Sequence, residues 1–197
     1  MADSLFLSLW FQDFETDEML PHALRLMQQF SFSKSEPGIA NVVLNPISWE
    51  QPTILERRFH PGVAPEVAVL VAADLLHADY AYVFEASWDL WSPQTSDGEW
   101  TQRPALVSFI ARGEEFGGGE AEAEGQLQVD FGPDIPFLYE ELELTGDVES
   151  RVRANVQALV DFINRVEKNV GAATRLLWSE SDENLAQKLI TRLQKVQ

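Results

Sequence analysis

The sequence predicts a mixed α+β fold built on an antiparallel sheet of about six strands, and three observations support this. An apolar helical pattern runs almost directly into a long alternating strand pattern between residues 65 and 91. Further strand patterns lie on both sides of this stretch, separated by turn residues. Two helical patterns end the chain. The length of 197 residues suits one domain, so residues 1–197 are expected to form a single α+β domain.

The run from Val67 to Leu76 is apolar on nearly every side, which predicts a helix covered on most of its surface. Pro65 and Glu66 before it suit the first turn of a helix. The β-branched residues leave a buried strand as the alternative, but the length of the run and its alanines favour a helix.

The segment from Tyr80 to Trp91 alternates with the period of a strand. Its even positions form one aromatic and apolar face, which must pack on another layer. Its odd positions begin small and apolar and become acidic toward the end. This pattern predicts a central strand that emerges into a solvated rim.

The first half of the chain has the order strand, helix, strand, strand, helix, strand, which resembles a ferredoxin-like βαββαβ arrangement. The remaining elements of this half are a strand at 5–11, a helix over about 20–30, and a hairpin of strands at 41–48 and 53–59. Pro46 predicts that the strand at 41–48 lies at an edge of the sheet.

The second half adds strands at 105–112 and 126–131, joined by a segment at 113–125 with three consecutive glycines and five glutamates. This composition predicts a flexible loop. An amphipathic helix is expected at 147–169, and a last helix after Ser179 or Ser181. The intervening residues 174–178 suit either a short strand or an extended link.

Composition excludes several classes of protein. Hydrophobic residues make up 45% of the chain, which indicates a real core, and the absence of cysteine excludes disulfides and thiolate chemistry. No apolar stretch approaches the roughly 20 residues that cross a bilayer, and the first residues lack the basic start of a secretory signal. We therefore expect a cytoplasmic protein that does not bind membranes.

The formal net charge is −18, and residues 113–149 hold nine glutamates and three aspartates but no lysine or arginine. This charge disfavours binding to nucleic acids and to anionic membranes. It is explained either by solubility alone or by a surface that complements a basic protein.

No motif specific to a chemistry is present. The three histidines stand apart, without the spacing that places two metal ligands on one helix face, so neither a metal site nor a cofactor is expected. The glycine run at 117–119 lacks the lysine of a phosphate-binding loop, and no Gly-x-Ser-x-Gly sequence occurs.

Five residues near the end of the 80–91 strand are candidates for a binding site: Glu85, Asp89, Trp91, Trp100 and His60. Glu85 and Asp89 share a strand face but stand about 13 Å apart, too far for a carboxylate dyad. The alternative is that Glu85, together with a carboxylate from a neighbouring strand, binds a divalent cation or polarises water. The two tryptophans flank the next loop and suit binding anchors, although core packing is the alternative. His60 ends a strand beside two arginines, where an ordinary loop histidine is the alternative.

These observations favour a non-enzymatic binding protein that docks a basic protein partner, with the character of an inhibitor or a toxin-neutralising immunity protein. The alternative is a small-molecule or metal-dependent enzyme that uses a cleft at the end of the 80–91 strand. The sequence does not decide whether the chain is an enzyme, and it does not predict the oligomeric state.

Overall fold

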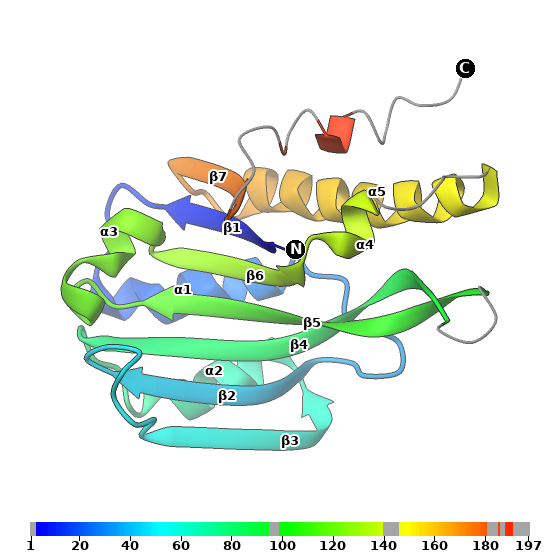
Figure 1. Cartoon of the computed structure of the whole chain (residues 1–197). Helices are drawn as coiled ribbons and strands as arrows, with labels where there is room; N and C mark the ends of the chain where they lie inside the picture. Colours follow the sequence, from blue (N-terminus) through cyan, green and yellow to red (C-terminus); the bar gives the residue numbers. More distant parts are fainter. Residues whose placement is uncertain (1–2, 95–98, 140–145, 181–184, 186–187, 191–197) are drawn as a thin grey trace.

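Alternation along the strands sorts apolar and polar side chains onto opposite faces of one sheet. In the computed structural model, seven strands pair antiparallel in the order β3-β2-β4-β5-β6-β1-β7 (Figure 1). The structure describes residues 3–94, 99–139, 146–180, 185 and 188–190. The predicted α+β class and antiparallel sheet are confirmed, with seven strands where about six were expected.

The elements follow in the order β1 (Ser4–Trp10), α1 (Thr16–Met27), β2 (Ile39–Pro46), β3 (Leu55–Val63), α2 (Pro65–Ala73), β4 (Tyr80–Pro93), β5 (Trp100–Arg112), a 3-10 turn (Phe116–Gly118), α3 (Glu120–Glu124), β6 (Leu127–Pro133), α4 (Ile135–Leu138), α5 (Gly146–Asn169) and β7 (Thr174–Ser179).

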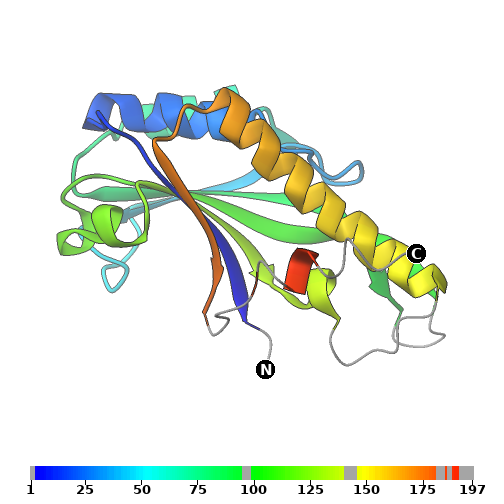
Figure 2. The same cartoon turned by 90° about the horizontal axis from the view of Figure 1, so that it is seen from above.

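Helices α1, α2 and α5 lie on the same side of the sheet, as the view from above shows (Figure 2). We call this side the helix face. The opposite side is the open face, because no described helix lies over its centre (Figure 1). The fold therefore has two layers, with its core between the helices and one face of the sheet.

Aromatic rings form the middle of this core. Phe30, which follows α1, contacts Trp88 of β4, Phe109 of β5 and Phe162 of α5, with ring centroids 5.4, 5.1 and 5.3 Å apart. Each large apolar side chain buried in this way stabilises the fold by roughly 1.5–3 kcal/mol. The even positions of β4 from Tyr82 to Leu90 are buried here, as the alternation predicts.

The predicted ferredoxin-like strand order is not the order found. In the ferredoxin-like arrangement, the first strand lies beside strands of the same βαββαβ unit. Here β4, β5 and β6 pair in chain order and occupy the sheet between β2 and β1. β1 instead pairs with β6 and β7, which come from the second half of the chain. Pairing of strands that follow one another in the chain thus decides the order.

The edges of the sheet also differ from expectation. β2 lies between β3 and β4, so the strand that contains Pro46 is not an edge strand. Pro46 is the last residue of β2, where its missing N–H disturbs the ladder little. The two edges are β3 and β7, and β7 shows that residues 174–179 form a strand rather than a link.

Helix α2 is confirmed as a helix, but it is not covered on most sides. Val67 and Leu70 are 46% and 69% exposed, whereas Ala68 and Ala72 are buried. The helix contacts α1 and β2 and has its remaining surface in solvent. The prediction of nearly complete burial was wrong because a helix in a two-layer fold receives cover from one side.

The segment 113–125 is folded, in contrast to the flexible loop predicted from its composition. Gly117, Gly118 and Gly119 adopt φ angles of 60°, 70° and 115°, which residues with a Cβ rarely adopt. The N–H of Gly117 donates to the carbonyl of Ile47 at 2.7 Å, which ties the segment to the turn after β2. Such a long-range contact cannot be seen in composition.

At the end of the chain, α5 is confirmed close to its predicted range. The second C-terminal helix, predicted after Ser179 or Ser181, lies mostly outside the described residues. None of the described helices is long and apolar enough to cross a membrane.

Candidate functional site on the open face of the sheet

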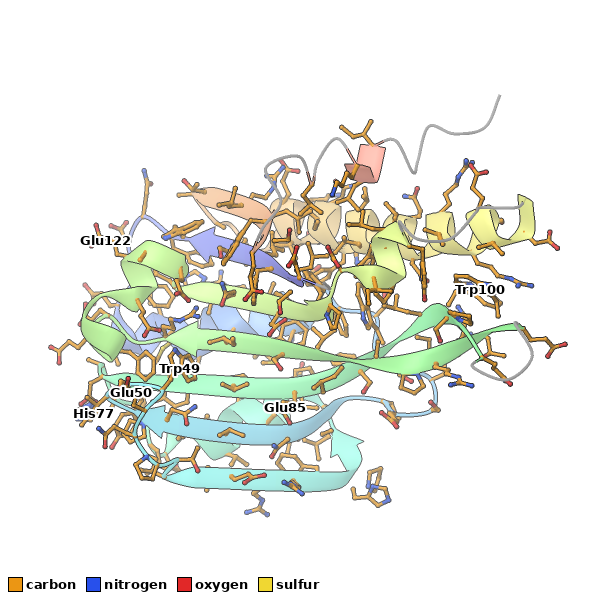
Figure 3. All side chains as sticks on the ribbon, viewed as in Figure 1. Trp49, Glu50, His77, Glu85, Trp100 and Glu122 are labelled. Atoms are coloured by element: carbon orange, nitrogen blue, oxygen red, sulfur yellow. The ribbon has the colours of Figure 1, made fainter. Side chains whose placement is uncertain are left out.

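A row of mostly polar side chains crosses the open face at one register. Strand pairing places in line Arg58 of β3, Asn41 of β2, Glu85 of β4, Ser108 of β5, Asp130 of β6, Phe6 of β1 and Trp178 of β7. We call these residues the cross-strand row. Glu85 lies near the middle of the sheet (Figure 3). Two strand spacings separate it from Asp130, so their Cα atoms are roughly 10 Å apart.

Glu85 is half-buried and receives one hydrogen bond from a side chain of the row. Asn41 Nδ2 donates to Glu85 Oε2 at 3.0 Å. This bond fixes the carboxylate against β2 and leaves its other oxygen without a hydrogen bond to any described side chain. None of the ion pairs among the described residues includes Glu85.

Asp130 is the second carboxylate of the row, and its environment disfavours the charged form. Burial raises the pKa of Asp130 above its ordinary value, and the negative charge of Glu180 raises it further. The N–H of Gly132 donates to Oδ1 at 2.8 Å and partly offsets these effects. No lysine, arginine or histidine within the described part of the chain forms an ion pair with Asp130.

A groove of about 380 Å³ opens beside Asp130. It lies where the pairing of β5 with β6 ends, at Ser108 and Asp130. Its walls are mostly apolar and come from β5, the end of β6 and α4. Leu106 and Ile135 on these walls are 60% and 47% exposed. The groove thus combines a carboxylate with apolar walls that face solvent.

A stacked aromatic pair borders the row on the other side of Asp130. The rings of Phe6 and Trp178 lie 4.7 Å apart, and the indole Nε1 of Trp178 donates to Ser8 Oγ at 3.0 Å. Both rings are half-buried on the open face. They supply a flat apolar surface next to the carboxylate.

The buried positive charge on the open face is already neutralised. Arg112 is only 2% exposed and donates to Gln128 Oε1 at 2.8 Å and to Glu124 Oε2 at 3.0 Å. Glu120 adds a second carboxylate at 3.6 Å. This cluster holds the 113–125 segment on the sheet and leaves no free cation there.

The sequence-predicted residue Asp89 lies on the same face of β4 as Glu85, but it binds the chain itself. Its carboxylate accepts hydrogen bonds from Ser33 Oγ at 2.6 Å and from the N–H of Lys34 at 3.0 Å. Asp89 therefore holds the connection between α1 and β2 against β4.

The two predicted tryptophan anchors lie in different environments. The backbone N–H and carbonyl of Trp91 are both bonded to the Asn155 side chain of α5, at 2.8 and 2.9 Å, and its ring lies under the Arg151 guanidinium, 5.3 Å away. Trp100 is only 7% exposed and packs on Tyr139 with ring centroids 4.9 Å apart. Figure 3 shows Trp100 at the end of the sheet far from Trp49.

His60 is exposed on the edge strand β3, and β2 separates it from β4. The structure therefore brings Glu85 and Asp89 onto one face but does not gather all five predicted residues at one point. Residues 95–98 of the loop that was expected to border the cleft lie outside the described residues. A binding role for Asp89, Trp91, Trp100 and His60 stays a prediction.

Asp130 and its groove were missed by the reasoning from sequence, although a signal was present. Leu127, Val129 and Phe131 alternate along β6, so Asp130 had to lie on the opposite face from the core. What the sequence could not show is that β6 lies two strands from β4, which aligns Asp130 with Glu85.

No group of three or more histidine, aspartate or glutamate side chains within the described ranges is arranged to hold a metal ion. The site instead offers two carboxylates, a hydroxyl and apolar surface, which suit recognition of a cationic group. Comparisons with protein families, with curated proteins and with solved structures find no match to this chain.

Proposed function

We propose that this chain is a non-enzymatic binding protein whose open face docks a basic protein partner. The observation that carries the proposal is the pair of half-buried carboxylates, Glu85 and Asp130, which no basic side chain of the described residues neutralises. They lie in one cross-strand row, beside an apolar groove.

The electrostatics of Asp130 favour a cationic partner. A carboxylate whose pKa is raised by burial has lost hydration without gaining a counter-charge. A lysine or arginine from a partner would supply that charge, and a hydrogen-bonded pair of this kind is strong when water is excluded. The formal net charge of −18 adds long-range attraction for a basic protein.

The shape of the groove supports the same partner. Lysine and arginine side chains have long apolar stems, which pack on apolar surface while the charged head reaches a polar group. Leu106, Ile135 and Pro136 suit the stem, and Asp130 suits the head. An isolated acidic site would attract any cation, whereas an acidic group beside apolar walls favours the side chain of a lysine or an arginine.

The alternative of an enzyme at the end of β4 receives less support. Asp89 and Trp91 are engaged with Ser33, Lys34 and Asn155 of the same chain, which suits a role in holding the fold. The groove beside Asp130 lies elsewhere, on β5 and β6.

The test is isothermal titration calorimetry with a defined arginine- and lysine-rich peptide and with its glutamine-substituted counterpart. We expect the basic peptide to bind and its glutamine-substituted counterpart not to bind. Glu85→Gln and Asp130→Asn should each weaken binding of the basic peptide by about tenfold or more. Asp161→Asn, on the exposed side of α5, removes the same charge away from the open face and is the matched control.

Equal weakening by Asp161→Asn would show that the peptide responds only to the total charge, and the proposal would fail. Unchanged binding by both open-face variants would also contradict it. Raising the salt concentration should weaken a genuine charge-mediated interaction in the unmodified chain.

A further inference from the structure

Helix α2 presents an apolar surface to solvent, in contrast to the other long helices. Val67 and Leu70 of α2, and Leu75 just after it, are 46%, 69% and 40% exposed. Three exposed large apolar side chains so close together are unusual on a surface that contacts only water.

This surface adjoins an edge of the sheet. A trough of about 420 Å³ lies between α2 and β3, and its walls include Leu55 and Arg57 of β3 and Leu70 of α2. β3 pairs only with β2 among the described strands, so its outer backbone groups are free to pair with another strand. Charged residues alone would protect such an edge, but they do not explain the apolar helix beside it.

We propose that this surface binds a second copy of the chain, with β3 paired antiparallel to β3 of the partner subunit and the two α2 helices facing each other across a two-fold axis. The inference does not rest on the proposed function, because β3 and α2 are separate from the groove beside Asp130.

The charges of β3 are self-complementary in one register. When the axis passes through Arg57, Glu56 lies opposite Arg58 of the partner subunit, and Arg58 lies opposite the partner's Glu56. In the single chain these two residues bond to each other, with Arg58 Nη2 donating to Glu56 Oε1 at 2.7 Å. The side chains of Arg58 and Glu56 are 80% and 45% exposed, so each can exchange its partner within the chain for the corresponding residue of the other subunit.

The helix side of the strand matches in the same register. Leu55 lies opposite Phe59 of the partner subunit, which forms an apolar cross-strand pair on each side of the axis. Arg57 lies opposite its own copy, and Asp74, which lines the same trough, places one carboxylate near this pair from each subunit.

The spacing of the two helices is also suitable. α2 contacts β2, so three strand spacings, about 14 Å, separate the two helices in the paired sheets. Directly packed helices lie roughly 8–10 Å apart. The two helices are therefore farther apart than directly packed helices, and the side chains that line the two troughs, Val67 and Leu70 among them, lie between them. The continuous sheet then directs both open faces to the same side and doubles the surface available to a partner.

Sedimentation velocity over a series of protein concentrations tests the proposal. We expect a reversible dimer for the unmodified chain. Leu70→Glu should raise the dimer dissociation constant by about tenfold or more, because it places a charge in the apolar contact. Leu106→Glu is the matched control, since Leu106 is 60% exposed on the open face, and it should leave the dimer unchanged.

The register is tested by charge reversal. Glu56→Arg alone and Arg58→Glu alone should each behave as monomers, because like charges then face each other across the axis. An equal mixture of the two variants should form a heterodimer, since residue 56 of each variant then faces an opposite charge at residue 58 of the other. A circular dichroism spectrum confirms that each variant is folded.

A monomer at every concentration for the unmodified chain would overturn the proposal. Dimers of unchanged affinity for Leu70→Glu would place the interface elsewhere and would also overturn it. Failure of the mixed variants to associate would reject the register centred on Arg57.

Discussion

The helix face and the open face are built from the same strands, yet residues one position apart meet opposite environments. Phe109 and Val129 on the helix face are 1% and 0% exposed beneath the helices. Their chain neighbours Ser108 and Asp130 on the open face are half-buried and border a groove. The helix face supplies the apolar contacts that a stable fold requires, so the polar row on the open face is available for the binding role proposed above.

The largest expected difference between the two faces is in stability. We expect Phe109→Ala to lower the free energy of unfolding by about 3–5 kcal/mol, because it removes a buried ring that contacts Phe30. The control on the adjacent residue, Ser108→Ala, should change it by less than about 0.5 kcal/mol. Urea unfolding followed by tryptophan fluorescence measures both. Similar losses for the two variants would show that the open face also holds the core together.

One end of the open face is an exception, since the Arg112 cluster there is covered. Arg112→Met should cost about 2 kcal/mol, because Gln128 and the carbonyl of Gly125 lose a buried donor. Glu124 is nearly half exposed and keeps its hydration in the variant, which limits the loss of stability. The exposed Arg103→Met is the control and should be nearly neutral. If thermal unfolding shows no loss for Arg112→Met, the cluster does not hold this end of the sheet.

A smaller effect is expected from His22 of α1, which is buried against Phe11. Burial lowers the pKa of His22, and the nearby Arg25 cation lowers it further, while Glu18 raises it. The neutral ring is thus favoured in the folded state. Its contribution to stability is complete above pH 6.5 or so, the ordinary value for histidine, and is lost as the pH falls through the folded pKa.

The measurement for His22 is the free energy of unfolding between about pH 8 and about pH 5, for the unmodified chain and for His22→Gln. The unmodified chain should lose more stability on acidification than the variant does. Parallel curves would contradict this, and would mean that His22 has the same pKa in the folded and unfolded chain.

Local sequence patterns predicted most of the helices and strands but not which strands pair with each other. The alternation at 80–91 correctly predicted a central strand, and the apolar stripe at 147–169 correctly predicted an amphipathic helix. The partners of β1 come from β6 and β7, and this long-range pairing has no local signature. The ferredoxin-like order was therefore wrong even though the elements that suggested it exist.

The same limit applies to the candidate site. Glu85 was identified because its own strand places it on the polar face. Asp130 was missed because its alignment with Glu85 depends on strand order. The run in α2 is apolar on all sides, so it contains no polar stripe that would mark the side of the helix exposed to solvent. The exposure of Val67 and Leu70 could therefore not be predicted from the sequence.

The proposed role of the open face makes stability and binding change in opposite directions at Asp130. Burial raises the pKa of this carboxyl, so its ionised form carries a cost in the folded state, and this cost is lost as the pH falls from the folded pKa to the ordinary value. Asp130→Asn keeps an oxygen that accepts from the N–H of Gly132 and removes the charge.

Thermal unfolding and titration with the basic peptide, both carried out on Asp130→Asn at neutral pH, test this account most directly. It predicts a melting temperature equal to or above that of the unmodified chain, together with peptide binding weakened by about tenfold or more. A stable variant that binds the peptide as tightly as the unmodified chain would contradict it.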